Sequence, residues 1–175
     1  MILRLPITVS VAILAASPAG AQVTREEALR LAYPGAVIKA ERLFLSPTQQ
    51  EAITHNSVDP PSPLVARYVA TLDGTPVGRA YVDTHTVRTK KESLLICLDE
   101  DGRVKRVDVT AFLEPPEYRA SEFWLGQYRG QALREELELS RAIRPLAGAT
   151  LTARAVNAAV RRVLTIDQAL TEGSR

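Results

Sequence analysis

The middle of the chain alternates apolar and polar residues with a period of two, which is the pattern of half-buried β-strands. Residues 64–72 lead into Asp73-Gly74, a pair that favours a tight hairpin turn, and residues 77–82 return as the partner strand. Residues 94–98 and 104–112 form a second pair of this kind. The sequence therefore predicts an antiparallel sheet of about four strands at the centre of the fold.

Helical patterns precede these strands. The capping box Thr24–Glu27 predicts a helix that ends before Tyr33. A second capping box, Ser46–Gln49, has proline at the first helical position and predicts a helix over residues 47–54. Between the two helices, residues 37–45 alternate loosely, which indicates a further strand.

Two more helices are expected after the predicted strands. A short aromatic helix runs from Glu122 to Tyr128 and is closed by Gly130. Further along, five apolar residues recur at helical spacing and predict an amphipathic helix over residues 153–164: Ala155, Val156, Ala159, Val160 and Val163. Together these elements predict the α+β class, an antiparallel sheet with flanking helices.

The composition is that of an ordinary globular domain. Of 175 residues, 46% are hydrophobic and 24% are charged, which is enough for one core. The net charge of +2, without basic runs between aromatic residues, gives nucleic-acid binding no basis. Cys97 is the only cysteine and lies in an apolar run typical of a buried strand. With one cysteine and two histidines, the sequence supports neither an intrachain disulfide nor a metal site.

The first 21 residues have the pattern of a secretory signal peptide. Arg4 supplies the positive start, residues 7–16 are apolar, and Ala19-Gly20-Ala21 is a small-residue cleavage pattern with the cut expected before Gln22. The sequence therefore predicts a periplasmic or secreted protein. An uncleaved membrane anchor is the alternative, although the apolar run is about half the length of a spanning helix. Residues 22–63 are interpreted as an N-terminal helical extension, and residues 64–175 as the main domain.

The turn before the last predicted helix has the residue types of a phosphate site. Gly148 and Ala149 leave the backbone uncovered, and Thr150 and Thr152 stand where an N-cap is expected. A helix N-terminus points free N–H groups and the positive end of its dipole outward, so it attracts phosphate. On spacing alone, a glycine-containing turn with a threonine cap is the better explanation of the pattern.

The stretch Gly148–Val156 resembles the Gly-Ala-Thr signature of FMN-binding domains, which occur in the periplasmic flavin subunits of the Rnf complex and of the sodium-pumping NADH:quinone oxidoreductase. In that family, the threonine corresponding to Thr150 carries FMN as a phosphodiester, attached by a flavin transferase that uses FAD as donor. Arg144 and Ala147 stand where the family usually has an acid and a hydroxyl residue. The resemblance therefore implies FMN binding at this turn and leaves the covalent bond as a separate question.

The resemblance also implies which side chains contact the cofactor. The phosphate is expected at Gly148, Ala149, Thr150, Leu151 and Thr152. The loop from Glu114 to Glu117 resembles the start of a family loop that lines the flavin ring, and Trp124 follows it. The family's glycine-rich loop corresponds to Gly78, Asp83, Thr84, Arg88, Thr89 and Lys90, of which Arg88 is the candidate flavin contact. Alternatively, the aromatic residues Phe123, Trp124 and Tyr128 cap the core, and residues 88–90 form a solvated turn.

The leading functional hypothesis is an exported FMN-binding flavoprotein that transfers electrons between a membrane or periplasmic donor and an acceptor. It has no catalytic residue of its own, since no Ser-His-Asp or Cys-His arrangement is evident. A second hypothesis is an exported, flavin-free binding or scaffold protein of the same fold, motivated by Arg144 and Ala147. A third is an exported hydrolase that uses Glu114 and Glu117 as paired carboxylates.

Overall fold

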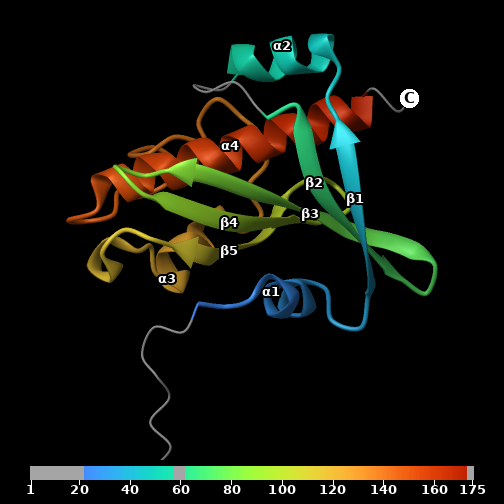
Figure 1. Cartoon of the computed structure of the whole chain (residues 1–175), viewed down its shortest axis with the longest axis horizontal. Coiled ribbons are helices and arrows are strands. Elements are labelled where there is room, and N and C mark those ends of the chain that lie inside the picture. Colours follow the sequence, from blue (N-terminus) through green and yellow to red (C-terminus); the bar gives the residue numbers. More distant parts are fainter. Residues whose placement is uncertain (1–21, 57–61, 173–175) are drawn as a thin grey trace, which may run out of the picture.

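The structure is a computed structural model that describes residues 22–56 and 62–172 (Figure 1). The predicted signal peptide lies outside the described residues. The described chain forms an antiparallel sheet with helices on both sides, so the α+β class predicted from the sequence is confirmed.

The sheet contains five strands that follow one another in chain order, each antiparallel to its neighbour: β1 (Val37–Phe44), β2 (Leu64–Leu72), β3 (Thr75–Thr86), β4 (Lys91–Leu98) and β5 (Val104–Phe112). The two predicted hairpins supply the last four strands. At the first turn, Asp73 and Gly74 have φ angles of 50° and 82°, the left-handed pair that a type I′ hairpin requires. The fifth strand is β1, at the position of the loose alternation.

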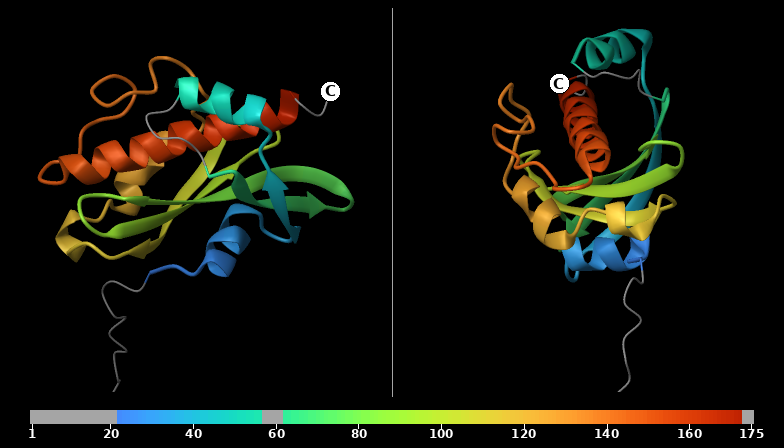
Figure 2. Two further views of the ribbon diagram at one scale, coloured as in Figure 1. Left: turned by 45° about the horizontal axis from the view of Figure 1, so that its top comes forward. Right: turned by 90° about the vertical axis from the view of Figure 1, so that its left-hand side faces the viewer.

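The helices are arranged in layers around the sheet. They are α1 (Arg25–Ala32), α2 (Pro47–Asn56), α3 (Glu122–Leu125) and α4 (Thr150–Glu172), with 3₁₀ turns at Pro116–Tyr118 and Gly126–Tyr128. In both Figure 1 and Figure 2, α4 crosses one face of the sheet, α2 lies on the outer side of α4, and α1 covers the opposite face. The helix α3 packs beside β5. Among the described residues, no helix is long and apolar enough to span a membrane.

Of the two predicted capping boxes, the one at α2 forms in both directions, whereas at α1 only the N-cap bond forms. Thr24 accepts a hydrogen bond from the backbone N–H of Glu27 at 3.2 Å, which fixes the start of α1. At α2, Ser46 and Gln49 exchange two hydrogen bonds, one from each backbone N–H to the other's side chain. Local sequence therefore determines where both N-terminal helices begin.

The last helix is longer than the sequence pattern indicated. α4 begins at Thr150, three residues before the predicted start, and continues to Glu172. The sequence pattern predicted the N-cap at Thr150 or Thr152. The residue before the first turn is instead Ala149, so neither threonine is the N-cap. The additional C-terminal turns are stabilised by contacts with the sheet and with α2. The prediction used only the helical spacing of apolar residues within 153–164, which gives no information on these contacts.

Two apolar clusters lie on opposite faces of the sheet. The larger joins α4, α2 and α3 to one face and includes Leu94, Ile96 and Val160, all fully buried. The smaller joins α1 to the other face through Ala28, Leu29 and Tyr33. Cys97 is buried in this smaller cluster, as its apolar run predicted, and burial raises the pKa of its thiol to about 12.

Gly78 lies within β3. The resemblance implied that it belongs to a glycine-rich loop, but here it allows close packing. A Cβ atom at this position would stand 2.4 Å from the carbonyl oxygen of Leu98 and 2.5 Å from the ring of Tyr33. The Tyr33 hydroxyl lies 2.7 Å from the carbonyl oxygens of Arg79 and Leu98, to which it donates. The absence of a side chain at Gly78 therefore lets the end of α1 dock on the sheet. Asp83 and Thr84, also assigned to that loop, lie in β3 as well.

Gly78→Ala is expected to lower the free energy of unfolding by about 2 kcal/mol, because the new methyl group collides with backbone and ring atoms and φ is +155°. Urea denaturation measures this change. Gly126→Ala is the control, since its Cβ would meet nothing within 4 Å and its φ is −57°. Equal stability of the two variants would contradict the docking role of Gly78.

Candidate functional site

Within residues 22–56 and 62–172, no side chain caps the N-terminus of α4, which is exposed at Gly148, Thr150 and Leu151. Gly148 has a φ of +74° and turns the chain into the helix, and an added Cβ there would meet nothing within 4 Å. Ala149 is buried and has no hydroxyl group, whereas α1, α2 and α3 begin after Thr24, Ser46 and Ser121, whose side chains accept the first-turn N–H groups. At the start of α4, by contrast, Thr150 and Leu151 are exposed, and their backbone N–H groups precede the first bond within the helix, from Ala153 to Ala149.

The loop that precedes this helix end is fixed through the backbone of Arg144. Its N–H donates to the side-chain oxygen of Gln127 at 2.9 Å, and its carbonyl oxygen accepts from Nε1 of Trp124 at 2.9 Å. The Arg144 side chain remains exposed. Trp124 therefore lies in the core and positions the loop from behind, and the aromatic helix predicted from the sequence is connected to the predicted phosphate turn.

A second attachment joins the helix end to the loop after β5. The hydroxyl of Thr152 is buried and donates to the carbonyl oxygen of Tyr118 at 2.8 Å. Thr152 thus does not face a ligand with its side chain but holds the turn Pro116–Tyr118 against the first turn of α4. Leu151, between the two threonines, is about half exposed.

Glu114 occupies a cradle of backbone amides at the turn between β3 and β4. One of its carboxylate oxygens accepts the N–H groups of Arg88, Thr89 and Lys90 at 3.2, 2.7 and 2.8 Å. These donors lower the pKa of the Glu114 carboxyl. Since this keeps the group ionised, it does not suit the general acid of a hydrolase. Glu114 instead connects the two turns that the resemblance assigned to the flavin ring.

The three aromatic residues of the short helix have different environments. Trp124 and Tyr128 are buried and meet edge to face, with 5.8 Å between ring centroids. Phe123 is 92% exposed, so the interpretation that all three cap the core is wrong for this residue. The sequence did not distinguish them, because a helix of one turn has too few residues to define an apolar face.

The sequence candidates therefore gather through a series of hydrogen bonds. Thr152 is joined to the loop after β5, and Glu114 joins that loop to residues 88–90. Trp124 joins the core to Arg144, in the segment that precedes Gly148. In Figures 1 and 2, the β3–β4 turn and the start of α4 lie at the same end of the molecule.

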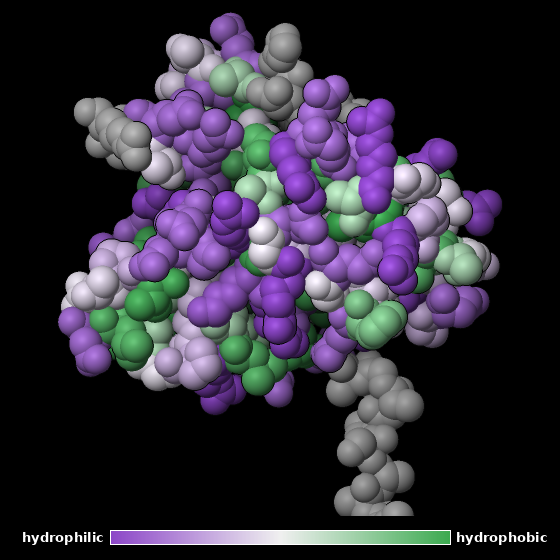
Figure 3. Space-filling model, turned by 180° about the vertical axis from the view of Figure 1, so that it is seen from behind, coloured by the Kyte–Doolittle hydropathy of each residue, from purple (hydrophilic) through white to green (hydrophobic). Residues whose placement is uncertain are grey.

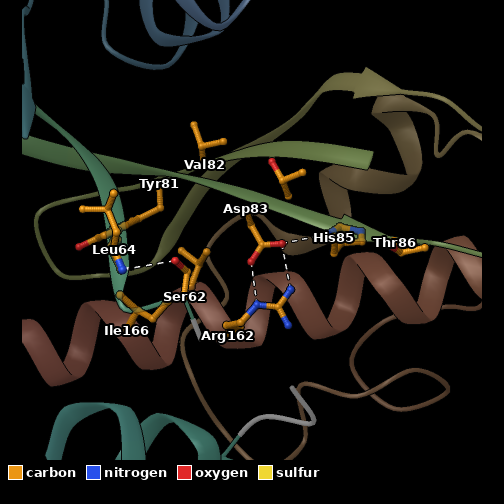
Figure 4. Close-up of a pocket in the computed structure, with 12 residues that line it drawn as sticks. Ser62, Leu64, Tyr81, Val82, Asp83, His85, Thr86, Arg162 and Ile166 are labelled. Atoms are coloured by element: carbon orange, nitrogen blue, oxygen red, sulfur yellow. Dashed lines mark hydrogen bonds and ion pairs between the residues drawn. The ribbon is translucent and has the colours of Figure 1, made fainter. Parts of the chain in front are cut away.

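A second polar arrangement, absent from the sequence predictions, lies between β3 and α4. Four alternate residues of β3 face α4 with polar side chains: Arg79, Tyr81, Asp83 and His85. Arg162 of α4 forms two hydrogen bonds to Asp83, at 2.7 and 2.9 Å, and Asp167 accepts from Arg79 and Tyr81. Figure 4 shows Asp83 and Arg162 facing each other beside a cavity of 490 Å³. We call Arg79, Tyr81, Asp83 and His85 the polar row of β3.

His85 lies between two carboxylates at one end of the polar row. Its ring nitrogens are 2.9 Å from Asp83 and 3.0 Å from Glu92. Burial favours the neutral ring, but the two carboxylates outweigh it and raise the pKa of His85 to about 9. Asp83 thus lies between two cationic side chains, His85 and Arg162. Glu92 is fully buried, and its Oε1 is the one buried side-chain atom of the described residues without a hydrogen-bond partner.

Residues 90–165 match the family model of the FMN-binding domain. This segment is therefore similar to FMN-binding domains, which supports the resemblance seen in the sequence. The matched segment includes Glu114, Trp124 and Gly148–Thr152, while Arg88 lies just before it. Neither the curated proteins nor the solved structures gave a match to the chain.

The uncapped end of α4 suits the phosphate group of FMN. The N–H groups of its first turn have no side-chain acceptor in the described part of the chain, and the helix dipole favours an anion there. Arg154 is exposed four residues after Thr150, on the same side of the helix. The cavity beside the polar row has other walls, formed by β2, β3 and the middle of α4. The polar row is therefore a structural feature separate from the phosphate candidate.

The stability of the fold should depend on the proton of His85. Its pKa rises from 6.5 to about 9 on folding, so the stabilisation is complete below pH 6.5 and is lost as the pH rises through 9. Between these values the free energy of unfolding is expected to fall by up to about 1.4 kcal/mol per pH unit. Urea unfolding at several pH values, with an NMR titration of the ring, measures both quantities. His85→Gln should remove this dependence; a wild-type profile that stays flat would contradict it.

Proposed function

We propose that this protein is an exported flavoprotein that holds FMN at the N-terminus of α4 and transfers electrons. The observation that carries the proposal is the uncapped end of α4 at Gly148-Ala149-Thr150, inside the segment that matches the FMN-binding domain. When bound, FMN exchanges electrons singly or in pairs, and the protein supplies its position and electrostatic environment.

The proposed phosphate seat consists of the first-turn amides of α4 with the hydroxyl of Thr150. Arg144 and Arg154, both exposed, supply positive charge on either side of that turn along the chain. Arg144 differs from the acid that the family usually has there, and a cation close to a phosphate is favourable. The rigid backbone at Arg144, fixed by Gln127 and Trp124, supports a seat formed before the ligand arrives.

We further propose that the flavin is bonded to Thr150 by a flavin transferase. In this reaction the Thr150 oxygen would attack the FMN phosphorus of FAD, the pyrophosphate bond would break, AMP would leave, and the hydroxyl proton would pass to the transferase or solvent. Thr150 is exposed at the first position of the helix, which suits access by a second protein. A phosphodiester at this position would be stabilised by the helix N-terminus.

The proposed location is the periplasm or the outside of the cell, after cleavage before Gln22. The support is the sequence pattern of residues 1–21. Redox partners on the membrane or in the same compartment follow from this location, since FMN that accepts electrons needs both a donor and an acceptor.

Gly148→Val is expected to abolish FMN binding to the apoprotein, because a β-branched residue cannot keep φ at +74° and would displace the turn. Gly130→Val is the matched control: its φ is +76° and its Cβ also has nothing within 4 Å, but it lies outside the proposed seat. Flavin fluorescence and the emission of the single tryptophan measure binding. If both variants bind FMN like the wild type, the seat lies elsewhere; if the wild type itself binds none, the flavin-free scaffold is favoured.

Thr150→Ala is expected to eliminate a covalent adduct, and Thr150→Ser to retain it, since only the hydroxyl takes part in the bond. Denaturing mass spectrometry of protein co-expressed with the host's flavin transferase detects an FMN-sized mass increase. Yellow wild-type protein that releases all its flavin on denaturation would contradict the bond while leaving reversible binding intact.

A further inference from the structure

The edge of the sheet at β5 is occupied by the protein's own chain. The backbone N–H of Gly130 donates to the carbonyl oxygen of Val104 at 2.7 Å, and the N–H of Val104 donates to that of Gln131 at 2.8 Å. Further along β5, the carbonyl oxygen of Val109 accepts from the side chain of Arg119 at 3.3 Å. The helix α3 also packs beside this strand. Another strand therefore has no free place at β5.

The edge at β1 is open. Within the described part of the chain, the backbone of β1 hydrogen bonds to β2 alone. Alternate residues of an antiparallel strand point their N–H and C=O groups to the same side, so half of Val37–Phe44 present these groups outward, as a template for another strand. On the face that Figure 3 shows, the described residues place apolar side chains in separate small groups, so this face has no broad apolar surface for a partner.

The charges of β1 are arranged symmetrically about Ala40. Lys39 and Glu41 flank this residue and lie on one face of the sheet, with Nζ of Lys39 3.5 Å from Oε1 of Glu41. The side chain of Lys39 is 77% exposed, while Glu41 is also bound by Arg67 of β2 at 2.8 Å. When a second copy of β1 lies antiparallel with Ala40 opposite Ala40, each Lys39 faces Glu41 of the other copy.

The geometry of an antiparallel pair leaves few registers for two copies of one strand. Opposite residues must both point their backbone groups toward the partner or both away from it, so a residue at the centre must face its own copy. The two such registers that pair most of β1 join residues 37–43, centred on Ala40, or residues 38–44, centred on Glu41. The second places Glu41 against itself, which is unfavourable. The charges therefore favour the register centred on Ala40.

We propose that two copies of this chain associate through β1, antiparallel and with Ala40 opposite Ala40, to form one sheet across both protomers. In this register Val37, which is 74% exposed, lies opposite Leu43 of the second copy and gains apolar contact. A lysine usually protects an edge strand from pairing, but here it selects the one partner strand that places a carboxylate opposite it. Since β5 is occupied, association stops at two copies. β1 lies outside residues 90–165, and this proposal does not depend on FMN binding.

Sedimentation equilibrium of protein purified from cells that express the whole sequence should show a concentration-dependent equilibrium between one and two protomers. Lys39→Glu should weaken association about tenfold, because two carboxylates then face each other at two places, and Glu41→Lys should do the same with two ammonium groups. A mixture of the two variants should associate like the wild type, since opposite charges face each other again in the mixed dimer. Circular dichroism confirms that each variant is folded.

The control for charge is Arg42→Gln. Arg42 is exposed on the same strand but lies opposite Ile38 of the second copy, so this change should leave association unaltered. Lys39→Gln, which removes the same charge, should weaken it several-fold.

A disulfide reports the register directly. Ala40→Cys should form a bond between protomers in oxidised glutathione, since opposite Cα atoms lie about 4.5–5.5 Å apart in an antiparallel pair. Phe44→Cys should not, because the two copies of this residue would lie about 27 Å apart. The proposal is overturned if the wild type stays a single protomer at every concentration, as pairing of β1 with a different protein would predict. It is also overturned if mixing Lys39→Glu with Glu41→Lys restores nothing, or if Phe44→Cys forms the bond as readily as Ala40→Cys.

Discussion

The attachment of α4 to β3 by buried ion pairs is the interaction on which the rest of the structure depends. Asp83 with Arg162, and Asp167 with Arg79, connect the middle and the end of the helix to one strand. Placing such charges in the core is costly, and the cost is offset only where the hydrogen bonds are complete. Arg162 forms two bonds to Asp83, and the hydroxyl of Tyr81 adds a second donor to Asp167. These geometric requirements restrict α4 to one orientation across the sheet, which apolar contacts alone would define less strictly.

This orientation determines what the first turn of α4 presents. Hydrogen bonds from Thr152 to Tyr118 and from Tyr128 to Asn157 hold the loops after β5 against the helix. Because Asn157 also donates to the carbonyl oxygen of Leu137, the irregular segment before Gly148 is attached to the same helix. The turn at Gly148-Ala149-Thr150 is thus held on both sides, and only its outer surface, with the amides and the Thr150 hydroxyl, is exposed.

The charged groups of the fold serve two different purposes. Those of the polar row are buried or partly buried and are paired with Arg162, Asp167 and Glu92, so they contribute to the specificity of packing. Those near the start of α4, Arg144 and Arg154, are exposed to solvent and could meet a ligand. The small net charge of +2 hides this division, because it sums paired and exposed groups alike.

Local features of the sequence were sufficient to predict the hairpins, the capping boxes and the Gly-Ala-Thr turn. Each depends on residues within a few positions of one another: Asp73 with Gly74, Ser46 with Gln49, Gly148 with Thr150. The tertiary structure alone decided the polar row, since Asp83 meets Arg162 across 79 positions and Asp167 meets Arg79 across 88. It also decided that Glu114 binds the amides of residues 88–90 and that Phe123 faces water while Trp124 does not. The physical reason is that periodicity records which face of an element is apolar, whereas the partner of a buried charge is chosen only when distant elements pack together.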